Sequence, residues 1–231
     1  MKSTLKKILS KKTIDFLIKI KNIFRYPFLN EHEKSVLKWI YRNYDKKRFN
    51  YRLGNGIVFD VGGYKGDYTA ELLKTNPDIT SYIFEPVSEF ANNLKTRFNN
   101  TPQVKVFNIG LSNITKQLEI SLDDDGSSFH KKSLSNKKEY AQIIDFKDFV
   151  DENKINHIAL LKLNIECAEY DLLERIINSN CINKIDHVLV QFHDIDEYST
   201  QRMHKLQEML SRTHQLSWAI RPFVWESWQK K

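Results

Sequence analysis

Residues 56–69 read Gly-Ile-Val-Phe-Asp-Val-Gly-Gly-Tyr-Lys-Gly-Asp-Tyr-Thr. The β-branched and aromatic run at 57–61 predicts a short central strand of a parallel sheet. Gly62, Gly63 and Gly66 then allow the backbone to turn tightly, and a helix is expected to follow. A strand, a glycine-rich turn and a helix in this order typically seat a nucleotide-like ligand.

The spacing of these glycines argues against a dinucleotide. It is Gly-Gly-x-x-Gly, whereas dinucleotide folds use Gly-x-Gly-x-x-Gly. Asp60 closes the strand, and a carboxylate at that position would repel a pyrophosphate. An NAD-dependent oxidoreductase is therefore an alternative rather than the first interpretation.

Beyond the turn, the chain alternates between predicted strands and helices, which favours one Rossmann-like α/β domain with a mostly parallel sheet flanked by helices. A polar loop near 123–128 and a lysine-rich stretch to Lys138 interrupt the alternation. Trp218 to Trp225 are expected to add the last strands. The other expected strands are 57–61, 81–85, 104–109, 117–122, 158–164 and 186–192, and the expected helices are 66–75, 88–98, 145–152, 168–179 and 199–211.

Charge is distributed unevenly along the 231 residues. The formal net charge is +7, yet residues 1–50 hold 14 Lys and Arg against 4 Asp and Glu, which leaves 22 against 25 for residues 51–231. Apolar residues at three- and four-residue steps near the start predict an amphipathic basic helix, with a second helix near 31–44. We therefore expect a basic helical extension over 1–50 and a main domain over 51–231.

The basic extension has three open interpretations. It packs on the main domain, rests on an anionic membrane surface through residues 1–28, or forms a contact in a homo-oligomer. Nucleic acid is not expected, because the main domain lacks a basic stripe. The chain has no run of roughly 20 apolar residues and no signal-peptide core. The sequence predicts a cytoplasmic protein, with a peripheral position at the inner face of the membrane as the second option.

Polar residues gather at the expected carboxyl ends of the strands, where an open parallel sheet forms its ligand crevice. Asp60 ends the first strand and Glu85 ends the second. Glu85 can accept hydrogen bonds from both hydroxyls of a ribose. Asn164 and Glu166 end a third such strand, and His193 ends a fourth. This pattern predicts a ligand that contains a ribose.

These motifs resemble the FkbM-type S-adenosylmethionine-dependent methyltransferases, and the resemblance covers roughly residues 55–228. Residues 59–69 look like the cofactor loop of that family, and Phe84-Glu85-Pro86 looks like its ribose motif. The stretch Leu161-Lys162-Leu163-Asn164-Ile165-Glu166-Cys167-Ala168-Glu169-Tyr170 is similar to the family's Lys-x-Asp-x-Glu-Gly-x-Glu, and Gln191-Phe192-His193 is similar to its Glu-Phe-His strand end.

The resemblance implies a class I methyltransferase fold over 51–231, with S-adenosylmethionine as methyl donor and S-adenosylhomocysteine as product. It also implies transfer to a hydroxyl of a carbohydrate or glycan-type acceptor. Asp60 and the amides after it are expected to hold the methionine tail of the donor, Glu85 the ribose, and residues 110–112 the adenine. The full set of expected cofactor contacts is Asp60, Val61, Gly62, Gly63, Gly66, Tyr68, Thr69, Glu85, Pro86, Gly110, Leu111, Ser112 and Asn164.

A sugar hydroxyl is a poor nucleophile unless its proton is removed as the new bond forms. Glu166 and His193 are the leading candidates for the catalytic base. Asn164 cannot act as a base, but its amide is expected to orient the acceptor or the amino group of the donor. Glu169 is expected to cap the following helix or to anchor Lys162.

Two residues depart from the pattern of the family. Asn164 stands where the family has Asp, and Cys167 stands where it has Gly. These departures raise the alternative of a non-catalytic module that binds S-adenosylmethionine. His193, Asp194 and Asp196 are residue types that bind metals, but the resemblance does not demand a metal, and none is expected.

The C-terminal segment 220–228 is rich in aromatic residues. Phe223, Trp225 and Trp228 are expected to complete the core beside the last strand. In a second interpretation, one indole forms a platform for the apolar face of a sugar.

Overall fold

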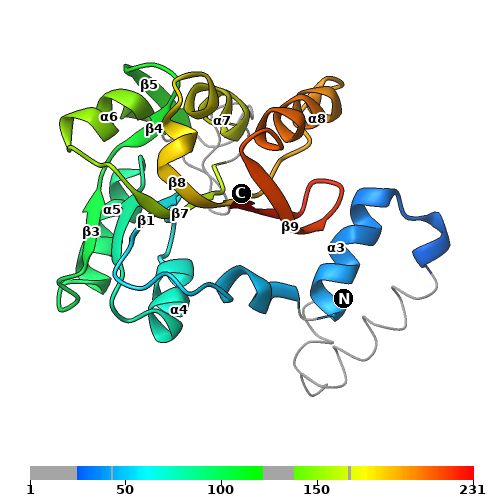
Figure 1. The fold of residues 1–231 in the computed structure, drawn as a ribbon, viewed down its shortest axis with the longest axis horizontal. Helices are drawn as coiled ribbons and strands as arrows, with labels where there is room; N and C mark the ends of the chain where they lie inside the picture. The colour runs from blue at the N-terminus through cyan, green and yellow to red at the C-terminus, as the bar shows by residue number, and fades with distance from the viewer. Residues whose placement is uncertain (1–24, 43, 122–137, 166–167) are drawn as a thin grey trace.

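A computed structural model describes residues 25–42, 44–121, 138–165 and 168–231. Its centre is a seven-stranded sheet in the order β3-β2-β1-β7-β8-β10-β9 (Figure 1). The first five of these strands are parallel, whereas β10 runs antiparallel to both β8 and β9. The expected parallel sheet is therefore confirmed. Its strands are β1 (Ile57–Val61), β2 (Thr80–Phe84), β3 (Val104–Phe107), β7 (Ile158–Leu163), β8 (Ile185–Val190), β9 (His214–Ile220) and β10 (Trp225–Lys230).

Helices cover both faces of this sheet. In Figure 1, α6, α7 and α8 lie above the sheet, α4 lies below it, and α3 lies to the right of the sheet beside β9. The layers are those of a Rossmann-like α/β domain, as the alternation predicts. The helices are α3 (Glu31–Tyr41), α4 (Asp67–Thr75), α5 (Ser88–Arg97), α6 (Phe146–Glu152), α7 (Glu169–Asn178) and α8 (Ser199–Leu210), with short 3-10 helices η1 (Tyr26–Phe28), η2 (Tyr44–Phe49) and η3 (Cys181–Lys184).

Strand β1 joins the two layers of the core. Val58 points into the core beneath α4, where it packs in one cluster with Leu72. Phe59 points the other way, into the larger core, and its ring lies 5.9 Å from that of Phe149 on α6. Both β1 side chains are fully buried. A strand covered on both faces needs a nearly continuous apolar run, which is what residues 57–61 provide.

A second, three-stranded sheet was not expected. It has the order β4-β6-β5 and consists of β4 (Gly110–Ser112), β5 (Lys116–Ser121) and β6 (Lys138–Asp145). The prediction that 117–122 joins the parallel sheet is wrong, because β5 pairs antiparallel with β6 instead. Strand β6 itself was missed. Its signal is the period-two burial of Ala141, Ile143 and Asp145.

Asp145 connects the small sheet to the helices that cover the main sheet. It ends β6 and caps α6, where its carboxylate accepts hydrogen bonds from the backbone of Lys147 at 2.8 Å and Asp148 at 3.1 Å. The same carboxylate accepts from Nε of Arg175 on α7 at 2.8 Å. One buried side chain therefore holds β6, α6 and α7 together.

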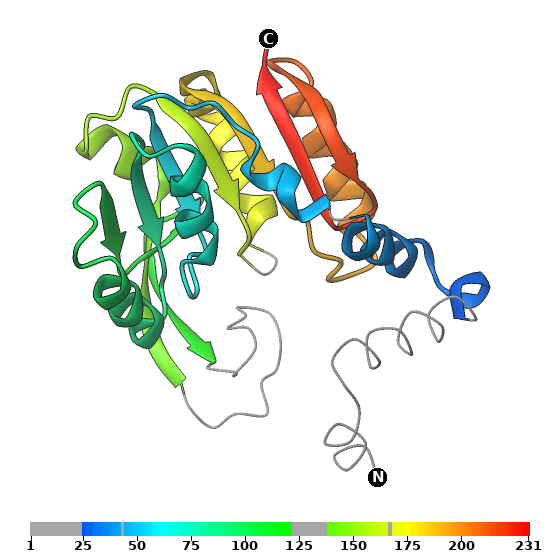
Figure 2. The ribbon, with the colours of Figure 1, turned by 90° about the horizontal axis from the view of Figure 1, so that it is seen from below.

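The described part of the basic extension packs on the C-terminal hairpin. Asn30 begins α3 with a capping box shared with Glu33. Trp39 stacks on Trp218 at 6.4 Å and on Trp225 at 6.5 Å between ring centroids. Figure 2 shows α3 beside the end of the β9–β10 hairpin. Residues 1–24, and with them the expected first helix, lie outside the described residues.

The C-terminal aromatic residues form part of the core, as predicted. Phe223, Trp225 and Trp228 are each less than a tenth exposed. None of these three rings is open to solvent as a platform for a sugar. Within the described ranges, no helix combines the length and the apolar character that crossing a bilayer requires.

The buried His214 should make stability depend on pH. Its Nε2 donates to the carbonyl of Ile185 at 3.0 Å, and burial lowers the pKa of its imidazole. Below about pH 6.5 the imidazole of His214 is therefore protonated in the unfolded chain but stays neutral in the folded chain. The free energy of unfolding consequently falls as the pH drops through that value. We expect a loss of up to about 1.4 kcal/mol per pH unit from this one group.

Urea unfolding at pH 7.5 and 5.5 measures this effect. His214→Gln should show a smaller loss between the two pH values than the native chain. The exposed His204, replaced by Gln, is the matched control and should leave the loss unchanged. Equal losses in His214→Gln and the native chain would exclude His214 as the source.

Candidate functional site

A cavity opens at the carboxyl ends of β1 and β2, where the small sheet meets the main one. It holds about 170 Å³ and has a largely apolar wall. This volume is below the roughly 300 Å³ of typical small-molecule sites, so the cavity fits one end of a nucleoside ligand rather than the whole ligand. It is lined by Val61, Gly62, Phe84, Pro86, Gly110, Leu111, Ser112, Asn113, Lys116, Leu118, Ile143, Ile165, Ala168 and Asp171.

Six of the expected cofactor contacts line this cavity. Val61 and Gly62 come from the end of β1, and Pro86 follows β2. Gly110, Leu111 and Ser112 form β4, which was expected to follow the third strand as a loop and instead belongs to the small sheet. The strand ends and the small sheet therefore bring these residues together.

Gly62 is required by the approach of another strand end. Its φ is +84°, and a Cβ at this position would lie 2.0 Å from the carbonyl oxygen of Asn164. The backbone of Asn164 in turn donates to the carbonyl of Val61 at 3.1 Å. The ends of β1 and β7 are thus in backbone contact, and only glycine fits between them.

The other two glycines of the turn face inward. A Cβ on Gly63 would lie 2.2 Å from Cγ2 of Ile83. Gly66 has a φ of +79° at the N-cap of α4, and a Cβ there would lie 2.6 Å from a methyl carbon of Leu94. Close packing accounts for both glycines, and their contact with a cofactor stays a prediction.

Glu85 is a buried carboxylate directly behind the glycine turn. It is 5 % exposed and accepts hydrogen bonds from the backbone of Tyr64 at 2.8 Å and of Val87 at 3.0 Å. Burial raises the pKa of its carboxyl group. Each carboxylate oxygen can accept more than one hydrogen bond, so the group retains capacity for a ribose hydroxyl.

Asp60 forms an ion pair inside the protein. Its Oδ1 lies 2.8 Å from Nζ of Lys162, and its Oδ2 accepts from the hydroxyl of Thr69 at 2.8 Å. Nζ of Lys162 also donates to the carbonyl of Gly62 at 2.8 Å. The Asp60 side chain is fully buried and does not line the cavity. Lys162 is thus anchored by Asp60 rather than by Glu169.

Tyr68 and Thr69 lie on the buried side of α4 and do not line the cavity either. The Tyr68 hydroxyl donates to the carbonyl of Arg48 at 3.1 Å. Burial raises the pKa of this phenol well above its usual value. These two residues support the glycine turn from behind.

A second cluster lies at the end of β8. Nδ1 of His193 is 3.0 Å from Oε1 of Glu169, which also accepts from the backbone of His193 at 2.8 Å. Glu169 is fully buried, and within the described ranges its Oε2 has no hydrogen-bond partner. The hydroxyl of Tyr170 donates to the carbonyl of His193 at 2.7 Å.

The pairing of Glu169 with His193 was not predicted from the sequence. Glu169 was expected to cap the helix or to hold Lys162; it lies in the first turn of α7 but, among the described residues, makes neither contact, and its carboxylate bonds to His193 instead. The sequence shows that Glu169 is an acidic residue close to an expected strand end. It does not show that its partner is His193, which is 24 positions further along the chain.

The first turn of α7 links this cluster to the cavity. Ala168 lines the cavity, and the next residue, Glu169, holds His193. Asn164 is half-buried and does not line the cavity, but its carbonyl lies against Gly62, which does. The expected base Glu166 lies outside the described residues, as does Cys167.

Sequence reasoning missed several residues of the cavity wall. The cavity residues on β5 and β6 could be predicted only after β6 had been recognised as a strand of a second sheet. Phe84 had a signal, because it directly precedes Glu85 at the end of β2. The missed residues are Phe84, Asn113, Lys116, Leu118, Ile143, Ile165, Ala168 and Asp171.

Residues 60–215 match a family model described as the methyltransferase FkbM domain. No curated protein matches this sequence. Among solved structures, fibrillarin of Methanococcus jannaschii is similar at 10 % identity, with 78 % of this chain and 69 % of that chain covered and a TM-score of 0.48.

Two further solved structures are similar at the same level. TrmK of M. capricolum in complex with S-adenosylhomocysteine is 12 % identical, with 80 % of this chain and 67 % of that chain covered and a TM-score of 0.46. An rRNA methylase of Streptococcus thermophilus is 11 % identical, with 83 % and 95 % covered and a TM-score of 0.46.

Proposed function

The chain belongs to the FkbM family of S-adenosylmethionine-dependent methyltransferases, and we propose that its acceptor is a hydroxyl group of a carbohydrate or glycan. Membership of this family decides against the NAD-dependent oxidoreductase. The resemblance of the motifs to the FkbM type supports the carbohydrate class of the acceptor. The cluster at His193 supports transfer to oxygen, because a hydroxyl group needs a base.

The cavity fits the nucleoside end of the donor. When bound, S-adenosylmethionine supplies an electrophilic methyl group on a positively charged sulfur. In this proposal the adenine lies between Val61, Pro86 and Leu111, and the buried carboxylate of Glu85 accepts from the ribose. The largely apolar wall suits a flat ring, and Glu85, which does not itself line the cavity, lies between two residues that do, Phe84 and Pro86.

The single observation that carries the proposal is the contact between Glu169 and His193 next to the cavity. A carboxylate at Nδ1 favours the tautomer in which Nδ1 carries the proton and Nε2 carries the lone pair. In this proposal the imidazole of His193 takes the proton of an acceptor hydroxyl as the oxygen attacks the methyl group. Glu169 acts through His193 and is a positioning residue.

Transfer of a labelled methyl group from S-adenosylmethionine to a panel of free glycans tests this function. We expect a product whose label survives mild alkali, because a methyl ether is stable where a methyl ester is hydrolysed. Label that appears only on an amine or a carboxylate would overturn the proposal. Tight binding of S-adenosylhomocysteine with no transfer to any glycan would also count against a carbohydrate acceptor.

Glu85→Ala should weaken binding of S-adenosylhomocysteine about a hundredfold or more. The change removes a charged acceptor, and each hydrogen bond to such a group contributes roughly 1.5–3 kcal/mol. Calorimetric titration measures the dissociation constant. Because the alanine also leaves the amides of Tyr64 and Val87 unpaired, Glu85→Gln serves as a second variant that keeps an acceptor oxygen.

The matched control is Glu89→Ala, which removes a carboxylate from the exposed first turn of α5. This control should bind S-adenosylhomocysteine as the native chain does. If both Glu85 variants also keep native affinity, the assignment of Glu85 to the ribose is wrong.

A further inference from the structure

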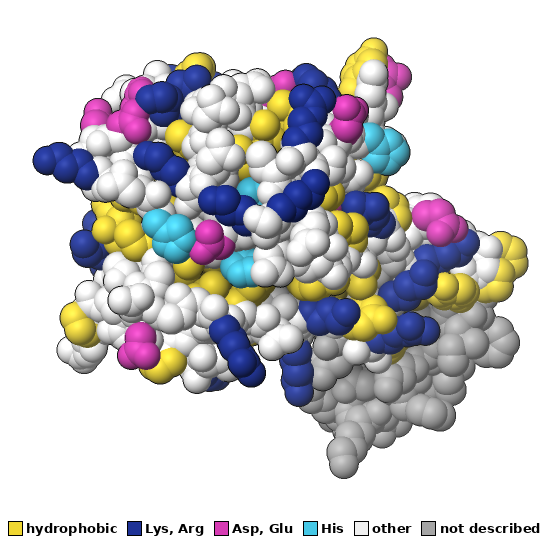
Figure 3. Space-filling model, in the orientation of Figure 1, with side chains coloured by type: hydrophobic (Ala, Val, Ile, Leu, Met, Phe, Trp, Pro, Cys, Tyr) yellow, Lys and Arg dark blue, Asp and Glu magenta, His cyan; other side chains and the backbone are white. Residues whose placement is uncertain are grey.

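A basic and apolar surface covers the outer side of the α3–η2 region. Lys and Arg side chains gather there on the face turned to the viewer in Figure 3. Two of its apolar side chains are strongly exposed, Phe28 at 88 % and Ile40 at 60 %. We call it the α3–η2 surface, and it consists of Phe28, Lys38, Ile40, Arg42, Lys46 and Lys47.

Helix α3 uses opposite sides for different purposes. Its inner side carries Ser35, which contacts the carbonyl of Arg221, and Trp39, which stacks on the hairpin. His32, on the same side, lies 3.1 Å from the carbonyl of Pro222. Lys38 and Ile40 are not needed for this packing and are exposed. The packing therefore leaves both flanks of the helix exposed, one basic at Lys38 and one apolar at Ile40.

The basic residues of this surface keep most of their charge unpaired. Within the described ranges, Lys38, Lys46 and Lys47 form no ion pair. Lys46 and Lys47 also line an open cavity of about 490 Å³ between η2 and α4, together with Lys74. The only carboxylate in the described lining of that cavity belongs to Glu71, which is paired with Lys74. A negatively charged group would meet an excess of positive charge there.

The distribution of charge along the chain points the same way. Residues 1–50 carry a large excess of Lys and Arg, whereas residues 51–231 carry a small excess of Asp and Glu. Such an asymmetry attracts and orients the molecule toward an anionic surface through its basic side. Phe28 and Ile40 add apolar groups that a phosphate backbone does not require but a lipid interface accepts.

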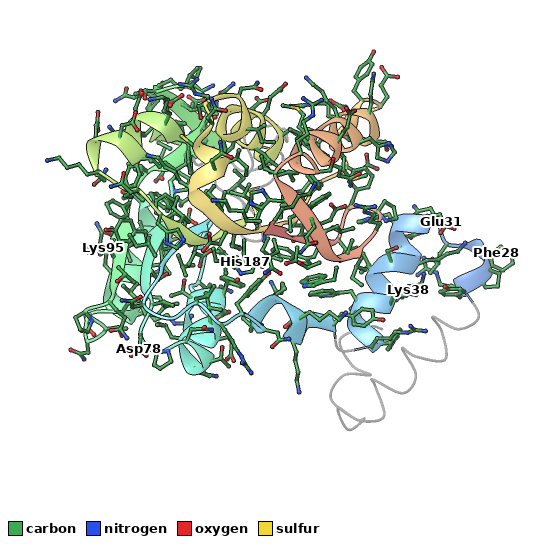
Figure 4. The ribbon with its side chains drawn as sticks, in the orientation of Figure 1. Phe28, Glu31, Lys38, Asp78, Lys95 and His187 are labelled. Carbon is green, nitrogen blue, oxygen red and sulfur yellow. The ribbon has the colours of Figure 1, made fainter. Side chains whose placement is uncertain are left out.

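We propose that the α3–η2 surface docks the protein on a membrane that contains anionic lipids. Lys46 and Lys47 contact lipid phosphates, and Phe28 inserts between headgroups. Figure 4 shows Phe28 and Lys38 on one side of the molecule and Lys95 on the opposite side. This inference is independent of the identity of the methyl acceptor, because it concerns a surface away from the cavity.

Co-sedimentation of the full chain with vesicles tests the docking surface. Vesicles of phosphatidylcholine with phosphatidylglycerol should pull down the protein, and vesicles of pure phosphatidylcholine should not. The variant Lys46→Gln/Lys47→Gln should bind roughly 25-fold more weakly, since each lysine near an anionic surface contributes about fivefold. Phe28→Ser should weaken binding about tenfold through lost apolar burial.

The matched control is Lys95→Gln/Lys105→Gln, which removes the same charge from α5 and β3. It should bind vesicles as the native chain does. Equal binding by the two double variants, or no binding of the native chain to anionic vesicles, would overturn the proposal. So would binding of a short RNA that is lost in Lys46→Gln/Lys47→Gln without any vesicle binding, because that result assigns the surface to nucleic acid.

Two readouts separate this proposal from the function of the site. Neither double variant changes a residue that lines the cavity at the carboxyl ends of β1 and β2, so both should bind S-adenosylhomocysteine with native affinity and transfer methyl groups to a free acceptor at the native rate. If the protein transfers methyl groups but does not bind vesicles, the docking proposal is wrong and the proposed function is not affected.

Discussion

Replacing His193 with alanine is expected to lower kcat by about 10²- to 10⁴-fold, the range that a positioned base contributes. Binding of S-adenosylhomocysteine should change little, because His193 does not line the cavity. Single-turnover transfer with a labelled donor, combined with calorimetry, separates the two effects. His157→Ala is the control, since His157 is an exposed residue that pairs with Asp186 just before β7.

Glu169→Gln distinguishes a positioning role from a structural one. Glutamine keeps the size of the side chain and an oxygen that can accept from the backbone of His193, but it removes the negative charge at Nδ1. We expect a lower kcat with a changed dependence on pH, at an unchanged melting temperature. If His193→Ala keeps full activity while Glu166→Gln loses it, Glu166 is the base and the proposed role of His193 is wrong.

Breaking the buried pair of Asp60 and Lys162 should produce the largest loss of stability. Asp60→Leu leaves the ammonium group of Lys162 in a site that is almost closed to solvent, and an unpaired buried charge costs about 3–5 kcal/mol. Lys162→Met should cost a similar amount. The double variant Asp60→Leu/Lys162→Met should recover much of this loss, because no charge then remains to be compensated.

Urea unfolding measures these three variants. The exposed pair of Glu208 and Arg212 is the control, and Glu208→Gln should change the free energy of unfolding by less than about 1 kcal/mol. A loss below 1 kcal/mol in both single variants would show that the buried pair does not hold the strand ends. The same double variant also tests the predicted contact of Asp60 with the methionine tail of the donor. If it keeps its affinity for S-adenosylhomocysteine, that prediction is wrong.

The main sheet was predictable because local pattern and burial agree in it. Residues 57–61 form a nearly continuous apolar run, and the glycines after them mark a tight turn in the sequence itself. The small sheet was not predictable in the same way. Strand β6 has only every second residue buried, and the partner of β5 lies beyond a long polar stretch, so neither strand reveals its sheet from its own residues.

The site shows the same division between local and distant information. Glu85 and His193 were identified because they end strands, and position at a strand end follows from the local pattern. The hydrogen-bond partners of other site residues, in contrast, are far away in the chain. Asp60 bonds to Lys162, 102 positions away, and His193 bonds to Glu169, so the inward role of Asp60 and the importance of Glu169 could not be derived from spacing alone.

The two neighbours Ala168 and Glu169 constrain how this enzyme can diverge. A larger side chain at 168 would narrow the cavity and displace the adjoining residue that holds His193. In the proposed function, donor binding and proton removal would therefore depend on the same helical turn, and a mutation in that turn would affect both. New acceptor preferences can evolve more freely in parts of the protein that this turn does not carry.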